Sequence, residues 1–597
     1  MREPNDILPF VLNGQSGTVI HGVYTMGNFK RVNRRTYLKS VGTLGAGSTL
    51  SLAGCAGRSG QQTNDETPTP DDETPTPESN GGEYEAARTP AVEEIPAGGT
   101  GVNLELVGHN PLLDEHQYEG DSFGIPRGSN GDITIAGDYV YVGSFIGHQP
   151  PLIVDVSDPT SPEVVGPVPD AVPGVANGVE GIEASGDVLV IAQRRPLGGL
   201  GFDVPEGMPE RGLAVYDISE PREPELVARF DHEGLDTHAL TLWRDPEDPE
   251  RLLGVHTMEE GSDIRVIDLT GCPDGDCEPE LVAEWDLETQ VGIETPSHEA
   301  IMSTDGERIY VAQYGAGVLV LDSSNLLASL RNDAECDPSA PESMPGDGHC
   351  LTAADSELEA SLEAQPDLPG EWQHTPLKVP DRPYLLAAAE SGGMEWDDDA
   401  GQVQKGTCPG ATIRFFELAT DGESVDPDPV GRFGVPEQQA ENCGNDGWEP
   451  DTVAEPAWLS PHFPLAFHDL AFSTYYSAGF RAIDISDPSA PVEVGHFFNE
   501  PVEEVRWASY GLRSDPEVDD DGEPVRQPLP QRHMFAFSYP IVYDGYLIYA
   551  DIHSGLYVLE YSGPHADQIP EEGNCISANP GAIEPGYEPC PPYGAPD

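Results

Sequence analysis

Short runs in which apolar and polar residues alternate recur along the chain from about residue 100 to residue 561. A period of two is typical of β-strands that bury one face. The runs follow one order: a strand, a Gly/Asp turn, a second strand, another turn, a third strand that ends near Asp, and a Pro-flanked fourth strand. Residues 133–145 followed by 152–166 show this order most clearly. The pattern predicts a repeated unit of four antiparallel strands.

Seven copies of the unit can be counted, at residues 133–166, 181–228, 238–284, 298–322, 374–431, 468–495 and 539–561. Regular repetition of a four-stranded unit is the signature of a β-propeller. An open two-sheet sandwich does not explain such regular recurrence. We therefore expect an all-β fold, a seven-bladed β-propeller.

The seventh copy lacks its fourth strand, and a matching segment stands in front of the first copy. Residues 104–108 read Leu-Glu-Leu-Val-Gly, which fits the missing strand type. We expect this N-terminal strand to join the last blade and close the ring. The propeller would then span residues 101–563, followed by a Pro/Gly-rich tail at 564–597.

Three units carry a shared Asp-rich signature that resembles a known family. Leu152–Pro159, Val215–Pro221 and Ile483–Pro488 resemble the LVIVD repeat of bacterial and archaeal surface proteins. This resemblance implies a β-propeller and is poor in functional information. More remotely, the same element is similar to the propeller of selenium-binding proteins and methanethiol oxidases, which are associated with copper. Their cysteine-bearing motifs are absent here, so that activity cannot be carried over residue by residue.

Acidic residues far outnumber basic ones, with 106 Asp and Glu against 29 Lys and Arg, for a formal charge of −77 over 597 residues. Such a field repels phosphate backbones and excludes nucleic acid as a partner. Acidic residues are spread along the whole chain, and Lys is rare, as in proteins of salt-loving archaea. High salt screens this self-repulsion, so the charge indicates habitat more than function.

The N-terminal region resembles an export signal. Arg34 and Arg35 lie in a twin-arginine-like motif, a weakly apolar run follows, and Leu52-Ala53-Gly54-Cys55 resembles a lipobox. We expect residues 1–55 to be a lipoprotein signal region, with Met26 as a candidate start, and Cys55 to receive the lipid that anchors the protein to the membrane. Residues 56–100, rich in Thr, Pro, Asp and Glu, are expected to form a disordered stalk. This places the protein outside the cell.

Eight cysteines remain once Cys55 is set aside, an even number that suits disulfides outside the cytoplasm. Proximity along the chain favours pairing within loops. The proposed pairs are Cys272–Cys277, Cys336–Cys350, Cys408–Cys443 and Cys575–Cys590.

Aligning the copies brings one position just before each innermost strand into register. It is occupied by Asp132, Glu180, His238, His298, His374, His468 and Tyr539. Innermost strands line the channel of a propeller, so these side chains should converge near one mouth. Loops on the same face hold His148, His256, Glu390 and His553, and long insertions emerge there as well.

Two interpretations of these histidines stay open. His238, His298, His374 and His468 could bind a transition metal (Cu, Zn or Fe), with Glu180 and Asp132 as further ligands. Alternatively, each histidine is a structural hydrogen-bonding group within its own blade.

The sequence favours a lipid-anchored binding or scaffold module at the cell surface, whose ligand is a surface protein, a glycan or a small molecule. The alternative is a metal-dependent oxidoreductase of the copper type that uses the channel histidines.

Overall fold

The structure is a computed structural model in which the chain divides into two compact units, Met1–Gly82 and Glu83–Asp597. All described residues belong to the second unit. They are 87–90, 94–113, 124–145, 149–172, 175–195, 211–232, 235–258, 263–272, 277–286, 297–313, 317–339, 348–353, 372–390, 395–397, 402–405, 411–418, 429–438, 459–507, 517–518, 524–571 and 573–576. The expectations for Arg34, Arg35, Cys55 and the stalk fall outside these residues.

The described part of the chain is all-β, and four-stranded antiparallel units recur along it. The first unit contains β3(Asn130–Ala136), β4(Tyr139–Ser144), β5(Leu152–Asp155) and β6(Glu163–Pro167), each paired with the next. A two-residue turn joins β3 to β4, and Gly137 takes a φ of 54° there. Glycine adopts this left-handed conformation without strain, which permits the tight hairpin.

The same pairing order returns in the following units. They comprise β7(Ala176–Ser185), β8(Val188–Arg194), β9(Gly212–Asp217) and β10(Glu225–Phe230); β11(Thr237–Asp245), β12(Asp248–Met258), β13(Asp263–Asp268) and β14(Glu280–Asp286); β15(Ser297–Met302), β16(Arg308–Gln313), β17(Gly317–Asp322) and β18(Thr352–Ala353); and β19(Trp372–Lys378), β20(Tyr384–Glu390), β23(Ile413–Glu417) and β24(Gly431–Phe433).

The last two sheets each include a strand from the beginning of the folded unit. One contains β25(Pro464–Ala466), β26(Leu470–Thr474), β27(Phe480–Asp484) and β28(Val492–Phe498), and β1(Thr100–Val102) pairs with β28. The other contains β32(Ile541–Tyr543), β33(Tyr546–Asp551) and β34(Gly555–Tyr561). Here β2(Leu104–Asn110) pairs antiparallel with β34, and β35(Asn574–Ile576) pairs with β32.

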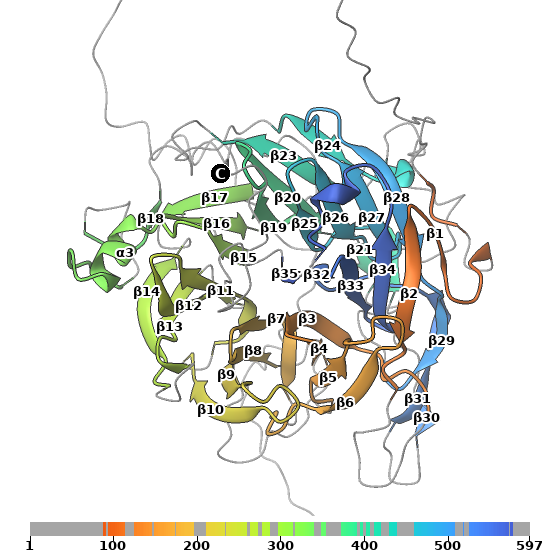
Figure 1. The fold of residues 1–597 in the computed structure, drawn as a ribbon, viewed down its shortest axis with the longest axis horizontal. Helices are drawn as coiled ribbons and strands as arrows, with labels where there is room; N and C mark the ends of the chain where they lie inside the picture. The colour runs from red at the N-terminus through yellow and green to blue at the C-terminus, as the bar shows by residue number, and fades with distance from the viewer. Residues whose placement is uncertain are drawn as a thin grey trace, which may run out of the picture. The chain divides into compact units, whose positions relative to one another are not determined.

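The sheets of this unit stand around a common centre, which is the arrangement of a β-propeller (Figure 1). The first strand of each sheet faces this centre, except in the last sheet, where β35 is added at the inner edge beside β32. Smaller additions lie between and beside them: the hairpin β21(Glu395–Asp397)–β22(Gln402–Lys405), the sheet of β29(Val502–Val505), β30(Glu517–Val518) and β31(Pro524–His533), and α3(Ser324–Leu330). Among the described residues, no helix is long and apolar enough to cross a membrane.

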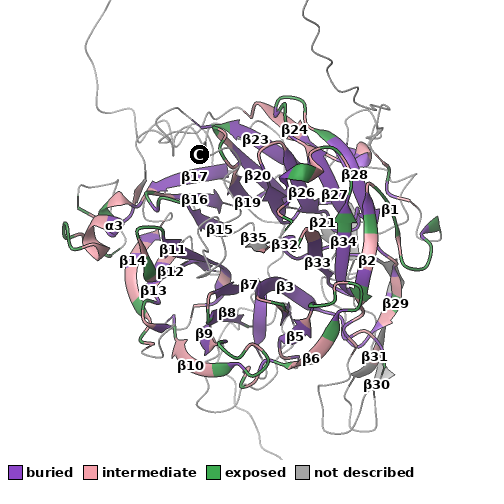
Figure 2. Ribbon diagram, viewed as in Figure 1, coloured by how far each residue is buried: buried purple, intermediate pink, exposed green. Residues whose placement is uncertain are grey.

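The core lies between neighbouring sheets, and burial falls from the centre outward (Figure 2). Every residue of the inner strands β3, β7 and β15 is buried, whereas the outer strands β6 and β10 are largely half-exposed. Tyr141 and Ile153 of one unit pack against Leu189 and Ile191 of the next. Because inner strands are buried throughout, any polar side chain on them requires a partner in the interior.

Two of the proposed disulfides, Cys272–Cys277 and Cys336–Cys350, are present. Cys408, Cys443 and Cys590 lie outside the described residues, so the other two pairings stay predictions, although Cys575 itself lies in β35.

Candidate metal centre

The polar residues of the inner strands sit where the strand register is interrupted. β7, β11, β15 and β19 each contain a register shift against their neighbour, and these shifts bracket Glu180, His238, His298 and His374, respectively. A bulge of this kind re-aims a side chain that would otherwise alternate with the pleat. The repeated irregularity thus turns one polar side chain of each of these units toward the centre.

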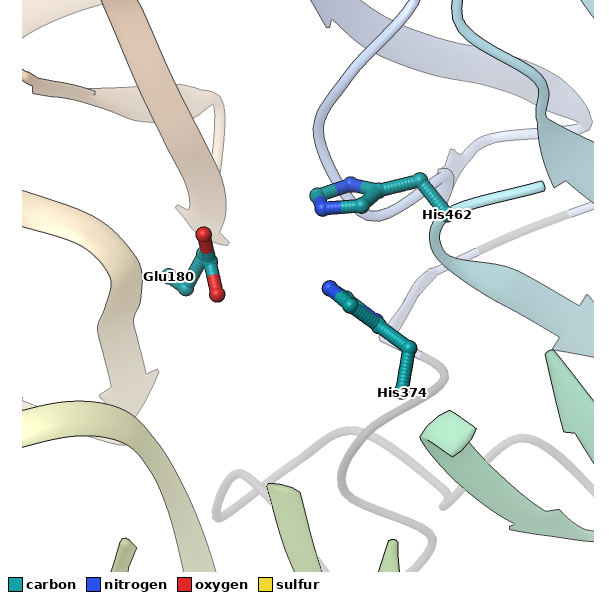
Figure 3. A group of neighbouring side chains, drawn as sticks. All are labelled: Glu180, His374 and His462. Atoms are coloured by element: carbon teal, nitrogen blue, oxygen red, sulfur yellow. The ribbon is translucent and has the colours of Figure 1, made fainter. Parts of the chain in front are cut away.

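Four imidazole rings and one carboxylate meet there. His238 Nε2 lies 3.0 Å and His298 Nε2 3.1 Å from the same oxygen, Glu180 Oε2. The rings follow one another around this carboxylate, with centroid separations of 4.2 Å for His238–His298, 3.5 Å for His298–His374 and 4.2 Å for His374–His462. Figure 3 shows the His374 and His462 rings facing Glu180.

The potential ligand atoms are close enough together for one ion to draw them in. The atoms of Glu180, His374 and His462 all lie within 4.8 Å of one another, and those of Glu180, His238 and His298 form a second such group. A third group consists of His298, Glu299 and His374. Imidazole nitrogen with carboxylate oxygen is a donor set that suits Zn, Fe and Cu.

Hydrogen bonds fix which nitrogens can act as ligands. His462 Nδ1 lies 2.6 Å from the carbonyl oxygen of Phe537, which can only accept, so this nitrogen carries the proton. His374 Nδ1 lies 2.7 Å from the hydroxyl oxygen of Thr375. The Nε2 atoms of His374 and His462 are buried and have no hydrogen-bond partner in the described structure. His462 therefore presents a lone pair at Nε2, and His374 does the same in the tautomer in which its Nδ1–H donates to the Thr375 hydroxyl. Outer hydrogen bonds give this arrangement to metal-binding histidines.

His238 plays a different part. A guanidinium NH group of Arg194 lies 2.9 Å from His238 Nδ1, and an arginine can only donate. Nδ1 is thus the acceptor, and the ring proton lies on Nε2, which faces Glu180. His238 donates to the carboxylate and orients it, whereas a metal ligand at this nitrogen would first have to lose the proton.

Burial keeps the rings of His374 and His462 neutral. It lowers the pKa of His462 to about 3 and holds the pKa of His374 well below its ordinary value. Burial alone would raise the pKa of Glu180, but the charges and hydrogen bonds of His238 and His298 outweigh it and keep this pKa well below the usual range. Two neutral imidazoles beside an ionised carboxylate are the protonation states that a metal ion requires.

A second layer of polar groups surrounds the rings. The Tyr539 hydroxyl donates to Glu299, and Glu299 also bonds to Thr375, the partner of His374. Burial is the main cause that raises the pKa of Glu299 to about 8. Asp132 accepts hydrogen bonds from the backbone NH groups of Ile133 and Tyr539. Asp132 thus holds the backbone and does not reach the histidines as a ligand.

The remaining candidates lie elsewhere. His468 lies outside the group, 38% exposed and 3.0 Å from Asp469. Glu390 accepts a hydrogen bond from Tyr476, and His553 is buried beside Phe535. His256 lies in β12 next to His232, and His148 lies outside the described residues.

His462 takes the place predicted for His468. The inner strand of this unit is β25, a strand of three residues that begins at Pro464, and β26 is its second strand. The longer apolar run of β26 was predicted as the first strand, so the predicted histidine lies six residues too late. The signal that could have found it is His462-Phe463-Pro464-Leu465, a histidine just before a short apolar run.

Comparisons with known proteins agree with the repeat. The model of the LVIVD repeat matches residues 127–170 and 476–498. Among curated proteins, none matches this sequence.

Solved structures similar to this chain include the β-propeller domain of Cps50 from Myceliophteria thermophila, with 10% identity, a TM-score of 0.37 and coverage of 73% of this chain and 98% of that one. Sqt1 from Chaetomium thermophilum has 10% identity, a TM-score of 0.39 and coverage of 73% and 97%. The computationally designed Ika8 protein has 9% identity, a TM-score of 0.35 and coverage of 76% and 99%.

Proposed function

We propose that this protein is a lipid-anchored, metal-binding β-propeller module at the surface of a salt-adapted cell. One observation is the main support for a metal site. The Nε2 atoms of His374 and His462, which have no hydrogen-bond partner in the described structure, converge on the ionised Glu180. Three buried rings and the partly buried ring of His238, gathered around one carboxylate, cannot each be explained by a hydrogen bond within its own blade. A zinc, copper or iron ion would replace the missing partners.

The propeller itself is proposed to have seven blades in a ring that β2 closes. Support comes from the recurrence of the four-stranded unit and from the pairing of Leu104 with Tyr561 and of Asn110 with Leu556. A ring closed by its own N-terminal strand has no unpaired edge between first and last blades. Such a scaffold is rigid enough to hold ligands from different sheets at fixed separations.

The partner is proposed to be a surface protein, a glycan or a small molecule, and the acidic charge excludes nucleic acid. We do not favour the oxidoreductase alternative. His374 and His462 are completely buried, which suits a structural or storage ion better than a substrate-binding one, and the comparisons provide no activity to carry over.

Metal analysis of the full chain tests the central site. Protein purified without chelator should contain one zinc, copper or iron ion per chain, and His374→Ala and His462→Ala should each weaken binding by more than about tenfold, because each removes a ligand. His468→Ala is the matched control, since this histidine lies outside the group. Metal-free protein, or loss of metal in the control alone, would contradict the proposal.

The anchor makes a separate prediction. Cys55→Ser should release the protein from the membrane fraction into the medium, because no lipid can then be attached to anchor it. Replacing Arg34 and Arg35 together with Lys should instead retain the protein inside the cell. Fractionation and immunoblotting distinguish the two outcomes. Cys55→Ser protein that stays bound to the membrane would contradict the proposal that Cys55 carries the lipid anchor.

A further inference from the structure

Three histidines of the central group differ in what their Nδ1 atoms contact. His462 Nδ1 faces a carbonyl oxygen, which only accepts, and His238 Nδ1 faces the Arg194 guanidinium, which only donates. These partners place the ring proton on Nδ1 of His462 and on Nε2 of His238. His374 Nδ1 lies 2.7 Å from the Thr375 hydroxyl, which can donate or accept. The tautomer of His374, and with it the lone pair at Nε2, therefore depends on what Thr375 itself contacts.

The Thr375 hydroxyl also bonds to the carboxyl group of Glu299. Glu299 Oε1 accepts the Tyr539 hydroxyl, whereas Oε2 is buried and has no hydrogen-bond partner in the described structure. The two hydroxyls therefore share Oε1, which accepts in an ionised carboxylate and also in a carboxylic acid whose proton lies on Oε2. Because a hydroxyl has one proton, a Thr375 that donates to Glu299 can only accept from His374. The ring proton of His374 then lies on Nδ1, and Nε2 keeps the lone pair.

The fold shields this chain of hydrogen bonds from water and assembles it from three units. All four residues are almost completely buried: His374, Thr375, Glu299 and Tyr539. Glu299 lies in β15, Thr375 in β19, and Tyr539 two residues before β32. Successive side chains of a strand normally point to opposite faces, but the register shift between Gln373 and Thr375 lets the His374 ring meet the Thr375 hydroxyl. Hydrogen bonds in such an interior are stronger than in water, so their direction is well defined.

We propose that Glu299 is a positioning residue of the metal centre, which acts through Thr375 to select the tautomer of His374 whose Nε2 can bind an ion. This inference rests on the proposed metal site and names the group that makes one of its ligands available. Without an acceptor at Glu299, the Thr375 hydroxyl would donate to Nδ1. His374 would then carry its proton on Nε2, as His238 does, and would no longer offer a lone pair to the ion.

Nitrogen NMR of the metal-free full chain reads the tautomer directly. With ¹⁵N-labelled histidine, and with the His374 signals identified by their loss in His374→Ala, the unsubstituted protein should show the proton on Nδ1. Glu299→Met removes the acceptor and should move the proton to Nε2. Glu299→Gln keeps an acceptor oxygen without an ionisable group, so it should retain the Nδ1 tautomer. This pair of variants separates the acceptor from the charge.

Zinc affinity measures the consequence for the site. In titrations of the full chain with Zn²⁺ against a chromophoric chelator, Glu299→Met should weaken binding about 10–100-fold, the usual cost of losing an outer partner of a metal-binding histidine. Glu299→Gln should bind nearly as tightly as the unsubstituted protein. Glu183→Met is the matched control: it removes another buried carboxyl of an inner strand, β7, and should change neither the tautomer nor the affinity.

Two results would overturn the proposal: a proton on Nε2 of His374 in the unsubstituted protein, or a folded Glu299→Met form that keeps the Nδ1 tautomer and the full Zn²⁺ affinity. Circular dichroism shows whether this form is folded. If it is not, Thr375→Val, which loses the hydroxyl, should weaken Zn²⁺ binding, and Thr375→Ser should restore it; equal affinities would contradict the proposal. An unsubstituted chain that binds no metal would instead contradict the proposed function, and the tautomer of His374 would still decide this inference.

Discussion

Replacing Arg481 with Met should destabilise the protein by about 3–5 kcal/mol, because the buried Glu493 carboxylate loses its arginine and keeps the His496 ring as its side-chain partner. Arg481 and Glu493 are both completely buried at the side chain and lie 2.8 Å apart. The Glu493 carboxylate also accepts the backbone NH of Ala87, and Arg481 donates to the carbonyl oxygen of the same residue. The pair thus connects the segment around Ala87 to the β25–β28 sheet, and its loss should weaken the packing of this segment and of the sheet. Urea unfolding in molar salt, followed by tryptophan fluorescence, measures the difference.

Arg526→Met is the matched control for this prediction. Arg526 lies 3.1 Å from Glu504 in an ion pair that is about 40% exposed on both sides, at 42% and 39%. Solvent-exposed pairs contribute about 0–1 kcal/mol, so this change should be nearly silent. The double variant Arg481→Met with Glu493→Leu should recover most of the lost stability, because no unpaired charge remains. Equal effects of Arg481→Met and Arg526→Met would contradict the assignment of a buried pair.

The alternation of apolar and polar residues predicted most of the strands and their antiparallel order, but not the three-residue strand β25. Ile133, Ile135, Val140 and Val142 alternate on β3 and β4, and all are buried against the neighbouring sheet. The turn residues between them set the hairpin lengths, as Gly137 does. These are local properties of the chain, so they are visible in the sequence.

The centre is predictable only in part, because its geometry depends on irregularities that have no pattern. Alignment of the repeats placed Glu180, His238, His298 and His374 at equivalent positions, and the structure brings these four together. It could not distinguish the ring that orients the carboxylate from the rings that can bind an ion. That distinction depends on Arg194, which comes from β8 and contacts His238 only in the folded chain.

The contact between His232 and His256 is a second feature that could not be predicted from the sequence. Neither stands out in the sequence as a member of a pair, since one follows an outer strand and the other lies inside a second strand. Contact between neighbouring units, rather than any motif, brings the two rings within 5.3 Å. Non-local contacts of this kind decide which buried polar atoms remain without partners.

Acidification should unfold the metal-free protein well above the pH at which most carboxylates titrate. Burial lowers the pKa of His232, His462 and His553 to about 3 in the folded state, whereas an unfolded histidine titrates near 6.5. Between these values the unfolded chain binds more protons, so the stability is present above pH 6.5 and is lost as the pH falls toward 3. From pH 6.5 to 4.5 each histidine removes about 2.7 kcal/mol, or roughly 8 kcal/mol for the three.

Glu299 opposes this trend. Its pKa is raised to about 8, so the folded state holds a proton that the unfolded state has released, and stability rises as the pH falls from 8 to about 4.5. Over the same two pH units it returns about 2.7 kcal/mol. Asp132 and Glu183, whose pKa values burial also raises, act in the same direction. His256 and His374, whose pKa values are held well below the ordinary value, add to the loss on acidification.

Urea unfolding of chelator-treated protein at pH 7, 6 and 5 measures this slope. His232→Leu should make it shallower by about 1.4 kcal/mol per pH unit, because one depressed pKa is removed. Glu299→Gln should make the loss on acidification steeper, because the opposing group is gone. A slope that His232→Leu does not alter would show that this ring is protonated in the folded protein and has a partner for its charge.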